Sequence, residues 1–169
     1  MSAPKDRASA SGSSRPHVAV VGPSRAEPAE AEAAEAVGRA LAERGAVLVC
    51  GGLGGAMEAA CRGAKSAGGT TVGILPGADR AAANEHVDIA VATGLGEARN
   101  AIVVRTADVV IAVGGAYGTL SEIALALAAG TPVIGVGTWQ LSRATGPDEG
   151  IVTAGSAEEA VERALHGRL

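Results

Sequence analysis

The sequence predicts an α/β protein with one doubly wound, Rossmann-like domain. Its predicted strands are short, continuous apolar runs rather than alternating ones, which is typical of strands buried on both faces of a parallel sheet. Segments with helical periodicity connect most of these runs, so helices are expected on both faces. The length of 169 residues favours a single domain with a mostly parallel sheet of about six or seven strands.

The first half of the chain is predicted to alternate strands and helices. An apolar run stops at Gly22-Pro23, and an Ala- and Glu-rich segment with one apolar face ends at Gly45. A second helix follows GGLGG and closes at Gly68-Gly69. The predicted elements are strands at 17–22, 46–50 and 70–76 and helices at 27–44 and 56–67.

The second half continues the pattern after a loop with one helical turn at 77–86. Gly130 ends the longest helix of this half, and Ser156 with Glu159 forms a capping-box pattern that predicts the start of the closing helix. Residues 139–150 are expected to be irregular. The predicted elements are strands at 87–92, 107–113, 131–136 and 151–154 and helices at 96–105, 119–129 and 157–165.

Composition limits the classes of partner. Hydrophobic residues make up 47% of the chain, yet it has one Tyr, one Trp and no Phe, so the core must be built from Val, Ile, Leu and Ala. The net charge is −4 and no stripe of Lys and Arg occurs. We therefore expect no nucleic-acid partner, because stacking platforms and a basic footprint are both missing from the sequence.

Residues 1–16 are rich in Ser, Ala, Gly and Pro and are predicted to be a disordered leader, with the folded domain over residues 17–169. The leader lacks the apolar core of a signal peptide, and no run approaches the roughly 18 apolar residues of a membrane span. Cys50 and Cys61 show no metal-ligand spacing and are interpreted as small buried residues. We expect a cytoplasmic protein without a membrane partner or a metal site.

Four glycine-containing stretches follow predicted strands: GPSR, GGLGG, PG and GGAYG. The carboxyl ends of parallel strands meet at one edge of the sheet, where ligands of this fold class bind. GGLGG and GGAYG also lead into helix N-termini, which favour phosphate or carboxylate. Neither a dinucleotide fingerprint nor a Walker A loop is present. Because short turns need glycine anyway, a purely structural role remains the alternative. The candidate ligand-binding residues are Gly22, Ser24, Gly51, Gly52, Gly54, Gly55, Met57, Pro76, Arg99, Asn100, Gly114, Gly115, Ala116, Tyr117, Gly118, Thr119 and Glu122.

Arg99 and Glu122 are candidate catalytic residues. Thr119 and Glu122 form a capping-box pattern, which predicts that Glu122 caps its helix. Arg99 and Glu122 nevertheless come from the helices on either side of one strand and could reach the same cleft. An arginine–carboxylate pair there would hold a phosphoribosyl group and stabilise positive charge at its C1 atom.

The segments CGGLGGAMEAACRGAKSAGGTTVGILP, ARN and GGAYGTLSEIALAL resemble the superfamily often mislabelled "lysine decarboxylase". It contains the LOG phosphoribohydrolases and the molybdenum cofactor carrier proteins, and the resemblance covers roughly residues 17–165. LOG enzymes carry P-G-G-x-G-T-x-x-E and an upstream arginine, and they hydrolyse the N-glycosidic bond of nucleoside 5′-monophosphates without a cofactor. The resemblance implies that Arg99 and Glu122 are the catalytic pair. No lysine has a convincing setting for a pyridoxal phosphate Schiff base, so we reject decarboxylase activity.

Four positions depart from the LOG pattern: Gly114 replaces Pro, Ala116 replaces Gly, Ser121 replaces Glu and Asn100 replaces Lys. ARN followed by GG-x-x-GT-x-SE looks more like the molybdenum cofactor carrier branch. The loss of a carboxylate at Ser121 favours a highly anionic ligand and changes the expected environment of Glu122.

Two functions therefore remain. The first is a binding protein for molybdenum cofactor, AMP or phosphate, and the second is a LOG-type phosphoribohydrolase. A nucleotide sensor or a DNA-processing role is a third alternative, against which the acidic charge counts. The resemblance also implies a homodimer or homotetramer.

Overall fold

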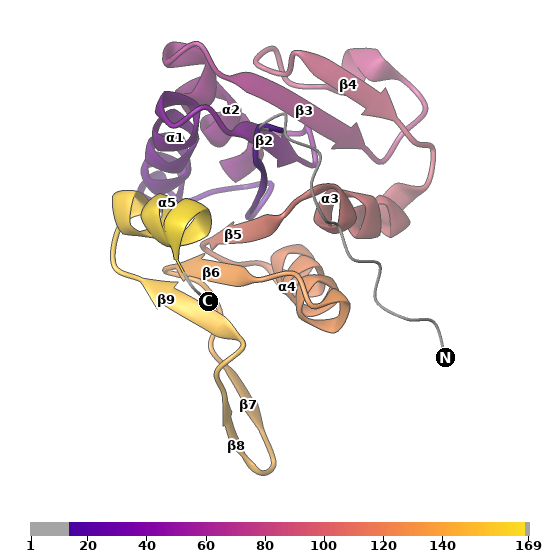
Figure 1. Ribbon diagram of the computed structural model, residues 1–169. Helices are drawn as coiled ribbons and strands as arrows, with labels where there is room; N and C mark the ends of the chain where they lie inside the picture. The colour runs from indigo at the N-terminus through magenta and orange to yellow at the C-terminus, as the bar shows by residue number, and fades with distance from the viewer. Residues whose placement is uncertain (1–13, 168–169) are drawn as a thin grey trace.

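The computed structural model describes residues 14–167 of the chain. They form three layers, with a sheet between two layers of helices (Figure 1). The main sheet has seven strands, all paired in parallel, in the order β4-β3-β2-β1-β5-β6-β9. The predicted doubly wound, Rossmann-like α/β fold is therefore confirmed. The strands are β1 (His17–Val21), β2 (Val47–Cys50), β3 (Thr70–Leu75), β4 (Ile89–Ala92), β5 (Val109–Val113), β6 (Val133–Val136) and β9 (Ile151–Ala154).

Helices cover both faces of this sheet, as predicted. One face carries α1 (Pro28–Glu43), α2 (Ala56–Ser66) and α5 (Ala157–His166), and the other carries α3 (Asn100–Thr106) and α4 (Tyr117–Ala129) (Figure 1). Strand side chains alternate between the two layers. In β1, Val18 and Val20 join the first core cluster, whereas Ala19 and Val21 join the second. Burial on both faces explains the continuous apolar runs of the strands.

No aromatic side chain is fully buried in the core of the described residues, as the composition predicts. Among the described residues, the largest fully buried side chains are those of Leu, Ile and Val. Trp139 is half-buried against the cluster beside α3 and α4. Cys50 and Cys61 are buried free thiols with their sulfur atoms 3.5 Å apart, which confirms their interpretation as small buried residues.

The connectivity places a crevice at the middle of the sheet. From β1 the chain proceeds outward through β2, β3 and β4, and then returns to β5 on the other side of β1. Loops that leave β1 and β5 at their carboxyl ends therefore diverge to opposite faces of the sheet. Ligands of doubly wound folds bind at such switch points.

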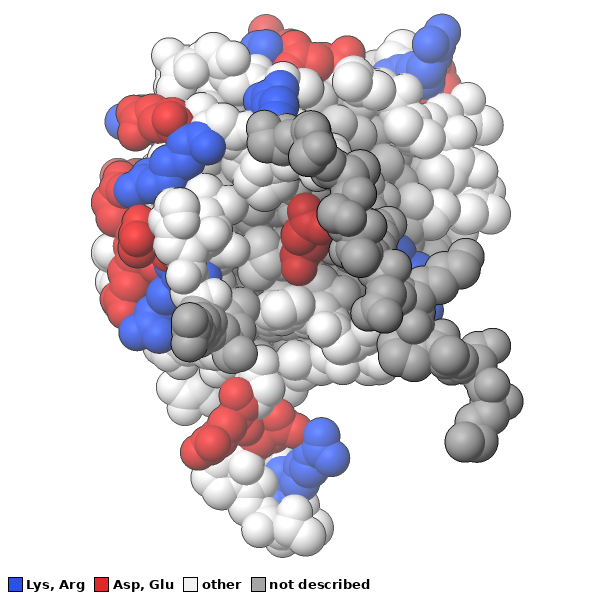
Figure 2. All heavy atoms as spheres, in the orientation of Figure 1, with Lys and Arg blue, Asp and Glu red and all other residues white. Residues whose placement is uncertain are grey.

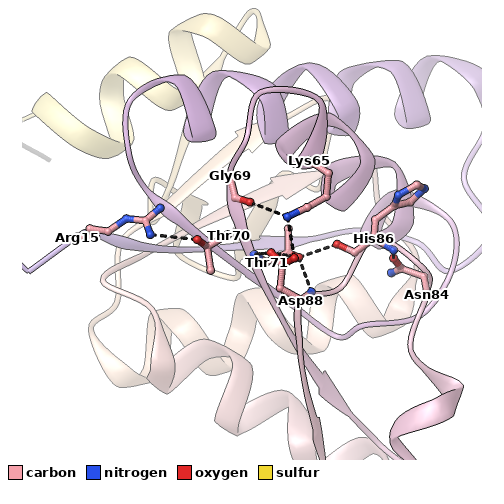
Figure 3. A network of polar contacts seen from close by, with 8 residues as sticks. All are labelled: Arg15, Lys65, Gly69, Thr70, Thr71, Asn84, His86 and Asp88. Carbon is pink, nitrogen blue, oxygen red and sulfur yellow. Dashed lines mark hydrogen bonds and ion pairs between the residues drawn. The ribbon is translucent and has the colours of Figure 1, made fainter.

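Strand β4 forms one edge of the sheet and is fixed by a polar network (Figure 3). Asp88 accepts hydrogen bonds from the Lys65 ammonium at 2.7 Å and from the Thr71 backbone N–H at 2.9 Å. The Thr71 hydroxyl donates to the carbonyl oxygen of His86 at 2.6 Å. Burial tends to raise the pKa of Asp88, but these hydrogen bonds outweigh it and lower that pKa below its usual value.

Residues 139–150, which were expected to be irregular, contain a second, two-stranded sheet. Strands β7 (Leu141–Arg143) and β8 (Gly146–Asp148) pair antiparallel and project from the body of the protein (Figure 1). Arg143 and Asp148 form an ion pair across it at 2.6 Å. The sequence did not predict this hairpin, because its turn lacks an Asn-Gly or Asp-Gly signal and because Pro147 counts against a strand.

Most of the predicted leader, residues 1–13, lies outside the described residues. The last residues of the predicted leader, 14–16, are described. There Arg15 donates hydrogen bonds to the carbonyl oxygen of Gly45 at 2.9 Å and to the Thr70 hydroxyl at 3.0 Å. On the face in Figure 2, acidic and basic side chains are interspersed without a continuous basic stripe. No helix in the described part of the chain has the length and apolarity to cross a membrane.

Candidate functional site

A cavity of about 190 Å³ opens at the carboxyl ends of β1, β2 and β5, at the switch point of the sheet. Its walls come from the loops after these strands, from the first turns of α2 and α4, and from the segment that leads into α3. The lining residues are Gly22, Pro23, Ser24, Leu53, Met57, Glu97, Arg99, Asn100, Ala116, Gly118, Thr119 and Glu122.

Many of the predicted site residues meet here. The cavity brings together Gly22, Ser24, Met57, Arg99, Asn100, Ala116, Gly118, Thr119 and Glu122. The other candidates, Gly51, Gly52, Gly54, Gly55, Pro76, Gly114, Gly115 and Tyr117, do not line it, and their contact with a ligand stays a prediction.

Among the described residues that line the cavity, Arg99 is the only one with a cationic side chain. It ends the short 3₁₀ helix Gly96–Arg99, and its side chain is only 9% exposed. Its Nη1 atom donates to the Asn100 side-chain oxygen and lies 3.8 Å from Oε1 of Glu122. Its Nε atom is buried and has no hydrogen-bond partner among the described residues. Buried guanidinium groups normally satisfy their N–H donors, so this unpaired nitrogen is an exception, and the side chain that carries it lines the cavity.

Glu122 does not cap its helix, so the capping-box prediction is wrong. Helix α4 begins at Tyr117, two residues before the predicted start, after an extended N-cap residue, Ala116. The Thr119 hydroxyl accepts from the Ala116 N–H at 3.4 Å, and Glu122 lies more than a turn into the helix. The Glu122 carboxyl group is therefore available to the cavity.

Burial controls the protonation of Glu122. Desolvation raises its pKa to about 7, the nearby Arg99 cation opposes that shift, and the Glu97 carboxylate adds to it. The carboxyl group thus changes its charge near neutral pH, where a general acid or base works best. This arrangement can bind an anion and can also transfer a proton.

The N-terminus of α4 adds positive potential without a basic residue. Ala116 provides no side-chain acceptor for the first turn of this helix, whereas the Ser156 hydroxyl caps α5 by accepting from the Glu159 N–H at 3.2 Å. Gly118 and Thr119, in the first turn of α4, line the cavity. Their N–H groups and the helix dipole favour an anion.

The glycines outside the cavity serve close packing. A Cβ atom on Gly51 would lie 2.9 Å from Nη2 of Arg99, so this glycine makes room for the guanidinium. Gly55 has φ +64°, and a Cβ atom there would lie 2.3 Å from the carbonyl oxygen of Pro23. The high glycine content of GGLGG therefore allows neighbouring loops to pack closely, in addition to any role at the cavity.

Sequence reasoning missed three lining residues: Pro23, Leu53 and Glu97. Pro23 and Leu53 lie inside the stretches GPSR and GGLGG, so their position alone was a usable signal. Glu97 precedes Arg99 by two positions, and only the 3₁₀ geometry of this segment places both at the cavity. Ser121 is exposed and does not line the cavity. The expected effect of the missing carboxylate at this position on the environment of Glu122 is therefore not supported by a shared place in the cavity wall.

One group of potential metal ligands occurs in the described part of the chain. Glu58, Glu85 and His86 have ligand atoms within 4.8 Å of one another, outside the cavity. The Glu85 side chain is 83% exposed, as is common for acidic groups at a protein surface.

The sequence matches a family model and a related archaeal protein. A model of the SLOG cluster4 family matches residues 15–161. An uncharacterised protein from Archaeoglobus fulgidus is 47% identical over 116 residues, which cover 69% of this chain and 76% of that protein.

Solved structures are also similar. The molybdenum cofactor binding protein from Rippkaea orientalis aligns with a TM-score of 0.81 and 39% identity, over 89% of this chain and 96% of that one. The molybdenum cofactor carrier protein from Chlamydomonas reinhardtii aligns with a TM-score of 0.75 and 34% identity, over 87% and 94% of the two chains. DNA processing protein A from Helicobacter pylori shares the fold alone, with a TM-score of 0.67 and 22% identity over 89% and 80%.

Proposed function

Because this chain belongs to the SLOG cluster4 family, we propose that it is a binding protein for a phosphorylated ligand, either molybdenum cofactor or a nucleotide. The membership and the similar carrier proteins confirm the resemblance to the LOG superfamily and its molybdenum cofactor carrier branch. The proposed site is the cavity at the switch point of the sheet.

The buried Arg99 guanidinium carries this proposal. Its Nε donor has no partner among the described residues, and the uncapped first turn of α4 lines the same cavity. A phosphate that accepts from the Arg99 guanidinium and from N–H groups of this turn would pair a buried cation with an anion, and charge-assisted bonds of this kind are among the strongest.

Calorimetric titration with molybdenum cofactor, AMP and inorganic phosphate tests the proposal. We expect saturable binding that Arg99→Gln weakens and that the matched control Arg62→Gln leaves unchanged, because Arg62 lies on the exposed side of α2, paired with Glu35. Absence of binding by all three probes, or equal binding by both variants, contradicts it.

The second candidate function is hydrolysis of a nucleoside 5′-monophosphate. A carboxyl group with a pKa of about 7, placed 3.8 Å from an arginine, favours it. Arg99 would orient the phosphoribosyl group, while Glu122 would stabilise the oxocarbenium-like transition state and position water.

Release of free base from AMP and N6-substituted AMP separates the two functions. Release that disappears in Glu122→Gln, but persists in the exposed control Glu43→Gln, overturns the pure binding role. Ligand binding without any release of base overturns the hydrolase.

We also infer that the protein forms a homodimer or a homotetramer. Large apolar side chains are exposed on and beside the edge strand β4, at Ile89, Val91 and Leu95, and on the outer helix layer, at Ile102 and Leu125. Such exposure marks association surfaces when it is contiguous. Light scattering coupled to gel filtration measures the mass, and a monomer at all concentrations contradicts the inference.

A further inference from the structure

The only tyrosine and the only tryptophan of the chain lie next to each other. The rings of Tyr117 and Trp139 have their centroids 5.8 Å apart, at an angle of 36°. Tyr117 is 83% exposed, more than any other large hydrophobic residue in the described part of the chain. An exposed aromatic ring at the first position of a helix has no role in packing the core.

The indole of Trp139 is held against the loop that precedes α4. Its Nε1 atom donates to the carbonyl oxygen of Ala116 at 3.2 Å. A Cβ atom on Gly115 would lie 2.6 Å from that same Nε1, so glycine at this position lets the indole lie flat on the loop. Trp139 in turn supports one side of the Tyr117 ring.

The aromatic pair lies beside the chain segment that lines the cavity containing Arg99, although neither ring lines that cavity itself. Ala116 and Gly118 both line that cavity, and Tyr117 lies between them in the chain. The space above Gly118 is open, since a Cβ atom there would meet nothing within 4 Å. The first turn of α4 therefore leaves open space at Gly118, between the cavity and the start of the helix at Tyr117.

On the other side of the loop, Trp139 lines a shallow depression of about 310 Å³ together with Thr138. The Thr138 hydroxyl oxygen is buried and has no hydrogen-bond partner among the described residues.

We propose that Tyr117 and Trp139 form an aromatic subsite, which takes the planar heteroaromatic ring of a ligand whose phosphate lies in the cavity beside Arg99. The inference rests on the proposed function and adds a ring-recognition element to it. The ring stacks on the exposed face of Tyr117, and Trp139 fixes the orientation of the tyrosine from behind. Stacking of this kind tolerates any flat ring, so the subsite selects aromatic ligands as a class.

The test compares three probes that share parts: AMP, ribose 5-phosphate, which lacks the base, and adenosine, which lacks the phosphate. Trp139 is the only tryptophan, so its fluorescence reports directly on the subsite. We expect AMP to quench this fluorescence and to bind roughly 5- to 100-fold more tightly than ribose 5-phosphate.

Tyr117→Ala should remove that preference while leaving the affinity for ribose 5-phosphate unchanged, and Tyr117→Phe should keep the preference. Leu95→Ala, which removes another exposed apolar side chain, is the matched control.

Each failure has its own signature. Equal affinities for AMP and ribose 5-phosphate, or an AMP preference that survives Tyr117→Ala, overturn the subsite and leave the phosphate site intact. Equal affinities for AMP and adenosine, with a preference that needs Tyr117, support the subsite and overturn the phosphate site. Lack of binding by every probe overturns both. A change of mass in Tyr117→Ala, with no effect on AMP binding, shows instead that a second copy of the chain covers the ring.

Discussion

The guanidinium of Arg99 and the carboxyl group of Glu122 lie 3.8 Å apart in the lining of one cavity, with side chains only 9% and 8% exposed. They come from segments on either side of β5, so the pair exists only when that strand is in the sheet. The separation exceeds that of a good hydrogen bond, so each group keeps bonding capacity for a third partner. The first three predictions concern this pair.

Removal of the arginine should disable anion binding more than it disables folding. In Arg99→Gln, affinity for AMP should fall about 10- to 100-fold, because a charge-assisted hydrogen bond is lost. The double variant Arg99→Gln with Glu122→Gln should show the same loss of affinity. Its second substitution removes the carboxyl group that would otherwise be buried without the arginine cation. Calorimetry measures the affinity, and a denaturant titration checks the fold. Full affinity in the double variant would refute the role of Arg99.

Stability should fall as the pH rises from 4.5 to about 7. The folded state holds the Glu122 proton up to a pKa of about 7, against 4.5 for an ordinary glutamate, so the folded protein binds more protons in this window. The stabilisation is complete below pH 4.5 and is lost as the pH passes 7. Between pH 5 and 8 the free energy of unfolding should drop by about 2 to 3 kcal/mol relative to Glu122→Gln. Denaturant titrations of both proteins at the two pH values measure this difference, and parallel pH curves would exclude the elevated pKa.

Anion binding should take up a proton. An anion beside Glu122 raises the pKa of its carboxyl group further, so affinity should decrease as the pH rises above 7, by at most about tenfold per pH unit. Sulfate is the suitable probe because its own charge stays constant in this range. Titrations from pH 6.5 to 8.5 should show this slope in the wild-type protein and a flat profile in Glu122→Gln. The same slope in both proteins contradicts the coupling.

Gly22, which lines the cavity, and Gly51, which lies outside it, should respond differently to substitution by alanine. A Cβ atom on Gly51 would press on the Met57 sulfur and the Arg99 guanidinium, which are flexible side-chain ends, so the fold should persist while AMP affinity falls about tenfold. A Cβ atom on Gly22 would lie 2.8 Å from the backbone oxygen of Val113, so Gly22→Ala should lower the free energy of unfolding by about 1–3 kcal/mol.

Gly77→Ala is the control for both substitutions, because a Cβ atom there meets nothing within 4 Å. Denaturant titration and calorimetry on the three variants separate the effects. A Gly51→Ala protein with wild-type affinity would show that the guanidinium can move without loss of function.

Regular packing made most of the fold predictable. Strands buried on both faces are continuous apolar runs, and helix ends such as Gly130, in the left-handed conformation, carry glycine. The β7–β8 hairpin was not predicted because its turn lacks an Asn-Gly or Asp-Gly signal and because Pro147 counts against a strand. The ion pair between Arg143 and Asp148 joins its strands, but an Arg and an Asp five positions apart are no signal of a hairpin.

The candidate site was predictable to the extent that it follows strand ends. Arg99 and Glu122 were correctly brought together because parallel strands share an edge. The start of α4 was misplaced because Thr119 and Glu122 mimic a capping box, while the actual N-cap is an alanine with no capping side chain. Burial then gives Glu122 its unusual pKa, and burial depends on packing from elements distant in sequence.

The pairing of β1 with β5 also has a kinetic consequence. The His17 backbone N–H donates to Asp108, a partner 91 positions away, and the two strands pair from Val18 with Val109 onward. Contacts across so long a stretch of chain are slow to form and cooperative, since loop-closure entropy must be overcome first. The crevice is assembled only by chains that have completed this step. An anion that occupies it therefore binds native molecules alone, so it should raise the melting temperature of the whole domain and slow amide exchange in both central strands.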